Sequence, residues 1–232
     1  MTTIRYPWDQ PPENGEITEI AEGVMWLRLP LPMKLDHVNI YILDDGDGWT
    51  LIDTGIKTRK VMGMWKHLID NILSGKPIKR VIATHHHPDH IGLHGWFVES
   101  YGAEYLSTQV AYLTARMLTL DTQEAYLDSQ IDFYRRAGMR SDLFEARKSE
   151  RPFNFSDIVH PIPIGFKKIS EGNKIEMGGR TWDIRVDHGH APDHATFWSC
   201  DDCLVLSGDQ IIPSISSNIG VYPTEPDSNP LK

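Results

Sequence analysis

The sequence has few of the features that mark secreted, membrane-spanning or disulfide-stapled proteins. Only two cysteines occur among its 232 residues, Cys200 and Cys203, and two are too few for a disulfide scaffold. No apolar run approaches the roughly 18 residues that a membrane-spanning helix needs. The N-terminal residues lack the apolar core of a signal peptide. We therefore expect a cytoplasmic protein with no membrane partner.

Positive charge is also scarce. The chain has 23 Lys and Arg against 32 Asp and Glu, and its formal net charge is -9 at pH 7. A nucleic-acid-binding surface needs a basic stripe. Two small basic clusters, at residues 57–60 and 135–140, are typical of solvated helix faces. We expect no nucleic-acid partner, and a small molecule as the substrate.

Histidine, by contrast, is concentrated in one place. Within residues 85–90 there are four histidines and one aspartate: His85, His86, His87, Asp89 and His90. A strand-like apolar run precedes them and a helix-like run follows. Neutral imidazoles and carboxylates are the ligands that zinc and similar ions prefer. An expression tag would lie at a terminus, so the cluster indicates a metal site rather than a solvated loop.

Strand-like and helix-like patterns alternate along most of the chain. Strands are expected at 17–29, 38–43, 49–53, 79–84, 104–106, 167–169, 174–177, 181–186, 195–198 and 203–206, and a helix at 61–73. Residues 108–151 are helical in pattern and more polar, with Val110, Leu113 and Met117 in one stripe. This block interrupts the alternation and is interpreted as an insertion, either a lid or binding wall or a set of packing helices. The whole chain, 1–232, is expected to form one α/β domain.

Four of the expected strands are followed directly by residues of the types that bind metal ions. The segments that follow them are Asp53-Thr54-Gly55, His85 to His90, Asp187-His188-Gly189-His190 and Ser207-Gly208-Asp209. In layered α/β folds the ligand site lies where the carboxyl ends of strands converge. We therefore expect these four segments to meet at one edge of the molecule.

These segments resemble the motifs of a known family. His85-x-His87-x-Asp89-His90 resembles the signature of the metallo-β-lactamase superfamily, and the other three segments resemble its further motifs in the same order. The resemblance covers nearly the whole chain. It implies a four-layered αβ/βα sandwich of two mixed β-sheets with flanking helices, and a metal centre at one edge.

The resemblance also implies which residues bind the metal. His85, His87 and His190 would hold a first ion, Asp89 and His90 a second, and Asp209 would bridge the two. The expected cofactor is zinc, as one or two ions, with iron or manganese as alternatives.

Two further residues would support these ligands. Asp53 would orient a ligand imidazole, as metal-bound histidines require, and His194 would lie behind the ligands or face the substrate. Asp89, His190 and Asp209 are the expected catalytic residues.

The chemistry implied is hydrolysis by a metal-bound hydroxide, which attacks a small carbonyl substrate such as a thioester, lactone or ester. Three alternatives are a phosphodiesterase or nuclease on the same centre, a mono-iron oxygenase of thiols or persulfides, and a catalytically impaired remnant.

One departure from the family pattern concerns the second ion. The family supplies a further histidine from near the C-terminus, but no histidine follows His194 in this chain. We interpret the C-terminal end as truncated and expect the second ion to bind weakly. Missing C-terminal elements would expose apolar surface, which favours self-association as a homodimer.

Three other polar features of the sequence are expected to have no role in metal binding. His86 is expected to be structural and to point away from the metals, and packing is favoured over a metal role for His94. The spacing of Cys200 and Cys203 is attributed to chance, because no second cysteine pair is present to complete a zinc site.

Overall fold

The computed structural model describes residues 4–213 and 215–231 and contains two β-sheets. The strands of the larger sheet lie side by side in chain order: β1 (Ile17–Ala21), β2 (Val24–Pro30), β3 (His37–Asp44), β4 (Trp49–Ile52), β5 (Ile78–Ile82), β6 (Glu104–Ser107) and β7 (Lys167–Lys168). The smaller sheet has the order β11 (Val205–Leu206), β10 (His194–Ser199), β9 (Arg180–Asp187) and β8 (Lys174–Met177).

The larger sheet is mixed. Strands β1 to β4 pair antiparallel, and β4 to β7 pair parallel. The described pairs of the smaller sheet are all antiparallel. The run expected as one strand at 17–29 is in fact the hairpin β1–β2. Gly23 makes its turn with φ +70°, a backbone conformation that favours glycine.

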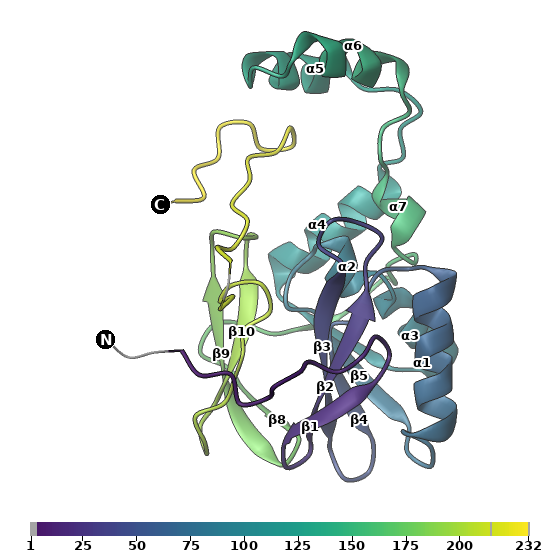
Figure 1. Cartoon of the computed structure of the whole chain (residues 1–232), viewed down its shortest axis with the longest axis vertical. Helices are drawn as coiled ribbons and strands as arrows, with labels where there is room; N and C mark the ends of the chain where they lie inside the picture. The colour runs from purple at the N-terminus through teal and green to yellow at the C-terminus, as the bar shows by residue number, and fades with distance from the viewer. Residues whose placement is uncertain (1–3, 214, 232) are drawn as a thin grey trace.

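Seven helices connect the strands of the described chain: α1 (Arg59–Asn71), α2 (Pro88–Ile91), α3 (His94–Tyr101), α4 (Gln109–Leu120), α5 (Asp128–Arg136), α6 (Ser141–Ser149) and α7 (Phe155–Ile158). The helices α1, α3 and α4 lie on one side of the larger sheet, and the smaller sheet lies on the other side (Figure 1). The larger sheet is therefore the middle layer of the body.

The helical layer is held by a core of apolar side chains. In α1 the buried residues are Val61, Trp65 and Leu68, whose spacing puts them on one face. The helix begins after Thr58, whose hydroxyl accepts a hydrogen bond from the Val61 N–H at 3.2 Å. Inside α4 the buried residues include Ala111, and the expected stripe of residues 110, 113 and 117 faces outward. The inner face of α4 consists of Ala111, Tyr112, Ala115 and Thr119.

A second core fills the space between the sheets. It contains Ile52 and Ile82 of the larger sheet, and Trp182, Ile184 and Phe197 of the smaller sheet. These side chains are at most 1% exposed. Because β4, β5, β9 and β11 also lead into the motif segments, this core fixes the relative position of the strand ends that carry them.

Replacing Phe197 with Ala should lower the free energy of unfolding by about 3–5 kcal/mol, because a fully buried aromatic ring is removed from between two sheets. Urea unfolding measures the change. The matched control is Phe153→Ala, where the ring is 60% exposed and the expected change is within about 0.5 kcal/mol. Equal stability of the two variants would contradict this description of the core.

The outer face of the smaller sheet is polar in the part of the chain that is described. Asp183 and Arg185 alternate with the buried residues of β9. On the neighbouring strand, the ring of Trp198 is covered by the guanidinium of Arg185, 4.0 Å from the ring centroid. No described helix lies on that side in Figure 1. The helices α1, α3 and α4 thus cover the larger sheet, and the outer face of the smaller sheet carries no helix of the described residues.

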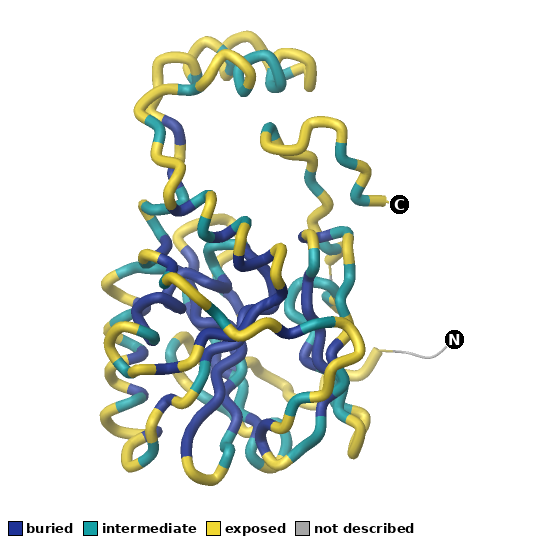
Figure 2. Tube along the Cα trace, turned by 180° about the vertical axis from the view of Figure 1, so that it is seen from behind, coloured by how far each residue is buried: buried dark blue, intermediate teal, exposed yellow. Residues whose placement is uncertain are grey.

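Helices α5 and α6 stand apart from the body. They form the raised feature at the top of Figures 1 and 2, and among the described residues neither helix contains a buried side chain. The helical pattern of residues 108–151 therefore covers two different structures: α4 packs on the core, while α5 and α6 extend beyond it. None of the helices in the described ranges is long and apolar enough to cross a membrane.

Candidate metal centre

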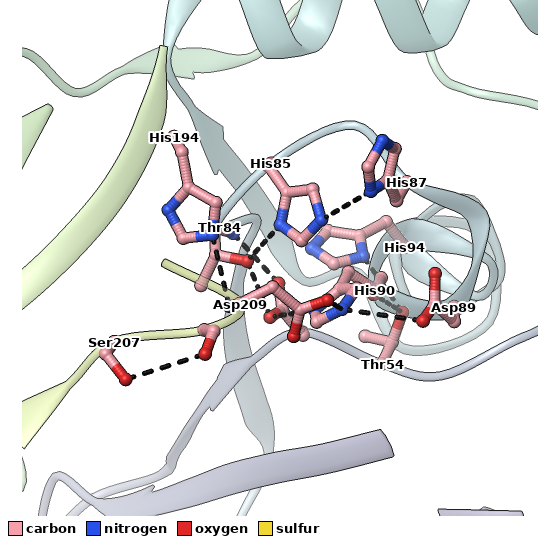
Figure 3. A network of polar contacts seen from close by, with 12 residues as sticks. Thr54, Thr84, His85, His87, Asp89, His90, His94, His194, Ser207 and Asp209 are labelled. Carbon is pink, nitrogen blue, oxygen red and sulfur yellow. Dashed lines mark hydrogen bonds and ion pairs between the residues drawn. The ribbon is translucent and has the colours of Figure 1, made fainter. Parts of the chain in front are cut away.

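Side chains of the four motif segments contact one another: Asp53 with His90, His85 with His190, and His190 with Asp209. Figure 3 shows the part of this cluster that contains Thr54, His85 and Asp209. Strand β4 leads into Asp53, β5 into His85, the β9–β10 connection carries His190, and β11 leads into Asp209. Three of these side chains are buried, and Asp209 is half-buried. The convergence expected from the sequence is present in the structure.

Three histidines form the first group of potential ligands. The Nε2 atom of His85 lies 3.0 Å from Nδ1 of His87 and 3.2 Å from Nε2 of His190. Their donor atoms all lie within 4.8 Å of one another, a spacing at which one ion could contact all three.

Hydrogen bonds on the far sides of two rings fix where the protons lie. The hydroxyl of Thr84 donates to Asp53 at 2.8 Å, so its oxygen accepts from Nδ1–H of His85 at 2.9 Å. Nδ1–H of His190 donates to the carbonyl oxygen of Asn218 at 2.8 Å. In the neutral rings both Nε2 atoms then carry lone pairs. Two lone pairs 3.2 Å apart repel unless a cation lies between them, so this arrangement fits a metal ion.

A second group contains His90, Asp209 and again His85. One oxygen of Asp209 lies 3.4 Å from Nε2 of His90 and 3.4 Å from Nε2 of His190, so this carboxylate stands between the two groups. A carboxylate oxygen of Asp89 lies 3.6 Å from Nε2 of His90. Nε2 of His90 is buried and has no hydrogen-bond partner among the described residues, which is the environment of a ligand atom.

Asp53 connects the two groups from behind. Its carboxylate accepts hydrogen bonds from the backbone N–H and the hydroxyl of Thr84, both at 2.8 Å, and from Nδ1–H of His90 at 2.7 Å. The residue is 2% exposed and has φ +64°, a conformation that aspartate tolerates better than most residues. Asp53 therefore orients His90 directly and His85 through Thr84.

The pKa values of the cluster follow from burial and from its carboxylates. Burial lowers the pKa of His85 well below its usual value and that of His87 to about 2, so both rings are neutral at pH 7. Burial also acts to lower the pKa of His90, but Asp53, Asp89 and Asp209 raise it well above its usual value. The position of His90 thus favours positive charge, whether from a proton or from a metal ion.

The remaining histidines lie around the ligand groups. The ring of His194 stacks on His85 with centroids 4.5 Å apart, and its Nε2 accepts from the Asp209 backbone N–H at 3.3 Å. His94 is buried behind the site, where its Nδ1 lies 2.9 Å from the Thr54 hydroxyl. His86 belongs to neither group but lines the cavity in front of them.

This cavity has a volume of about 570 Å³ and is lined by members of both groups, His87 and His190 of the first and Asp209 of the second. His87, Asp89, His190 and Asp209 form its floor. Its wall comes from segments far away in sequence, which include residues 121–155 and residues 218–224. The last of these also supplies the carbonyl that orients His190.

Several of these residues were not identified from the sequence. Thr84 adjoins the histidine cluster, and a hydroxyl next to a ligand histidine is the signal that could have identified it. Asn218 contributes a backbone carbonyl, which any residue type carries, so no sequence signal was available. By contrast, His37 at the start of β3 is not part of the site, because it contacts Arg28 and Asp36 and is in neither ligand group.

The comparisons with known proteins agree with this geometry. A family model described as the metallo-beta-lactamase superfamily matches residues 33–228. The chain is 26% identical over 199 residues to a Bacillus subtilis (strain 168) protein named "Probable metallo-hydrolase YqjP", over 85% of this chain and 60% of that protein. The chain thus spans about 60% of the length of this curated relative.

Two solved structures are similar in fold and sequence. A beta-lactamase domain protein from Burkholderia ambifaria is 33% identical with a TM-score of 0.83, over 97% of this chain and 67% of that chain. A metallo-beta-lactamase family protein from Thermus thermophilus is 27% identical with a TM-score of 0.74, over 89% of this chain and 65% of that chain.

The family match covers most of the chain, and the two sheets with flanking helices confirm the expected fold. The histidine and aspartate groups that could hold a metal ion coincide with the family-like motifs. The chain belongs to the metallo-β-lactamase superfamily.

Proposed function

We propose that this protein is a zinc-dependent hydrolase of small carbonyl substrates, that is, of a thioester, a lactone or an ester. The observation that carries the proposal is the pair of Nε2 lone pairs of His85 and His190, held 3.2 Å apart directly behind an open cavity that His87, Asp89, His190 and Asp209 line. Imidazoles with fixed tautomers facing a substrate-sized space are typical of a catalytic rather than a purely structural metal site.

The ligand assignment divides the cluster between two ions. His85, His87 and His190 would hold the first ion, Asp89 and His90 the second, and Asp209 would lie between them. When bound, the metal polarises the substrate carbonyl and lowers the pKa of a coordinated water towards neutrality. The second ion has fewer donors, and we propose that it binds more weakly than the first.

The protein's own groups have three tasks in this reaction. Asp53 and Asn218 accept from Nδ1–H of His90 and His190, which leaves the Nε2 atom of each ring for the metal. The Asp89 carboxylate lines the cavity, where it can take a proton from the attacking water and return it to the leaving thiol or alcohol. His194 holds the backbone of Asp209 in place.

Removing the metal should abolish turnover and lower stability together. At a free metal concentration of about 1,000 times the Kd, the bound ion should contribute about 4 kcal/mol to the free energy of unfolding. The experiment measures metal content, thermal unfolding and hydrolysis before chelation, after chelation, and after adding back zinc, iron or manganese singly.

The substrate panel contains a thioester, a lactone, an ester and a phosphodiester, with oxygen uptake recorded on thiols. Zinc-restored hydrolysis of a carbonyl substrate supports the proposal. Equal hydrolysis by the metal-free protein would contradict it, and so would activity confined to the phosphodiester or to oxygen uptake.

A further inference from the structure

The wall of the cavity opposite the metal ligands is formed by the α5–α6 segment, defined here as residues 121–157. Tyr126, Gln130, Tyr134 and Arg147 of this segment line the same cavity as His87 and Asp209. These four side chains are half-buried, in a pair of helices that are otherwise mostly exposed. The segment therefore turns one defined face towards the metal centre.

Arg147 differs from the other cations of this segment. Its neighbours in the segment are each within ion-pair distance of a carboxylate: Arg135 and Arg136 of Asp132, Arg140 of Asp142, Lys148 of Glu145, and Arg151 of Asp157. No carboxylate among the described residues pairs with Arg147. It is also the one Lys or Arg among the described residues that line the cavity, in a chain whose net charge is -9.

Two tyrosines hold the guanidinium of Arg147 in place. It lies 4.7 Å from the ring centroid of Tyr134 and 5.5 Å from that of Tyr126, and it donates to the Tyr126 hydroxyl at 3.3 Å. The two rings are nearly perpendicular, at 85°. Contacts with ring faces orient a guanidinium without neutralising its charge. Its remaining N–H groups are free to bind an anion, and the planar fork suits carboxylate, sulfonate or phosphate oxygens.

The cavity that contains the metal ligands and Arg147 is lined by apolar as well as polar side chains. Its lining includes Leu35, Leu118, Phe153, Phe155 and Tyr222. A ligand that reaches from the metal ligands to Arg147 would therefore place an apolar body along these side chains.

We propose that Arg147 is a specificity-determining residue that binds an anionic group of the substrate. The substrate would then be a carbonyl compound with an apolar body and a carboxylate, sulfonate or phosphate remote from the scissile bond. This inference rests on the proposed function, since it takes the cavity over the metal ligands as the substrate site. In this proposal the α5–α6 segment binds the anionic group of the substrate, and the motif segments carry out its hydrolysis.

The test is isothermal titration of the metal-loaded protein with 1-octanesulfonate and with its neutral analogue octyl methyl sulfone. Arg147→Gln should weaken sulfonate binding about 10- to 100-fold, the loss expected for a charge-assisted hydrogen bond. Arg147→Lys should retain part of the affinity, because it keeps the charge and loses the planar fork. Arg140→Gln, on the same helical segment but paired with Asp142, should bind as the wild type does.

The neutral sulfone shows whether Arg147 binds the anionic group or only stabilises the packing of α5 and α6. If Arg147 only holds α5 and α6 together, Arg147→Gln will weaken both ligands equally, and the proposal is overturned. It is also overturned if the wild type binds the sulfonate no more tightly than the sulfone. Titration requires no turnover, so its result is independent of whether the protein hydrolyses carbonyl substrates.

A kinetic measurement complements the titration where the hydrolase proposal holds. Arg147→Gln should raise KM for mono-4-nitrophenyl glutarate about tenfold or more while kcat stays near the wild-type value. KM for the uncharged 4-nitrophenyl butanoate should not change. An equal rise in both KM values would overturn the proposal.

Discussion

The His85→Ala variant is expected to lose its bound metal and at least about a thousandfold in kcat/KM. His85 contributes to both ligand groups, so its removal should affect both ions. Polarisation of the substrate and acidification of water are each worth several kcal/mol of transition-state stabilisation, and about 1.4 kcal/mol corresponds to a factor of ten in rate. Elemental analysis and hydrolysis assays on the same preparation measure both effects.

A matched control for this variant is His67→Ala. His67 is an exposed histidine on α1 and belongs to neither ligand group. Its replacement removes one imidazole without touching the cluster, so metal content and turnover should equal those of the wild type. If His85→Ala keeps its metal, or loses no more activity than the control, the assignment of the metal centre is wrong.

The Asp53→Asn variant tests how the ligands are oriented. Asp53 accepts three hydrogen bonds, two from Thr84 and one from His90. An asparagine of the same shape has one NH2 group, which would face one of these donors and leave it unsatisfied in a buried site. We expect metal affinity to fall about 10- to 100-fold and the free energy of unfolding to fall by about 1–3 kcal/mol.

The control for Asp53 is another aspartate–histidine pair. Asp36 contacts Nδ1 of His37 at 2.6 Å, but it is exposed and belongs to neither ligand group. Asp36→Asn should leave metal affinity unchanged. Unchanged metal affinity in Asp53→Asn as well would contradict the role assigned to Asp53.

The strand ends explain why so much of the site could be predicted from the sequence. Asp53, His85 and Asp209 follow strands whose apolar residues are recognisable in the sequence. The carboxyl ends of β4, β5 and β11, which these residues follow, lie near one another once the two sheets pack. Asp53 was expected to support a ligand imidazole, and its hydrogen bond with His90 fits that expectation.

The direction in which α4 faces could not be predicted in the same way. The stripe of Val110, Leu113 and Met117 suggested a buried face, but these side chains are 37–52% exposed. Ala111, Tyr112, Ala115 and Thr119 are buried instead. Hydrophobic periodicity identifies a helix, but the helix's distance from its neighbours decides whether large or small residues face them.

The cavity wall was unpredictable for a different reason. Arg147 lines the cavity and the Asn218 carbonyl contacts His190 because of how distant segments pack, and nothing in their local sequence distinguishes them. Five other cations lie in the α5–α6 segment, and only the structure shows which one lacks a carboxylate partner among the described residues. The carbonyl oxygen of Asn218 depends on the path of the backbone alone.

The most direct measurement is anomalous diffraction from crystals of the metal-loaded protein at the absorption edge of the bound metal. The prediction is a peak about 2.0–2.1 Å from Nε2 of His85, Nδ1 of His87 and Nε2 of His190, the distance expected for histidine ligands of zinc. A weaker second peak is expected beside His90 and Asp209. A loaded crystal whose peak lies away from the three histidines would contradict the assignment of the metal centre.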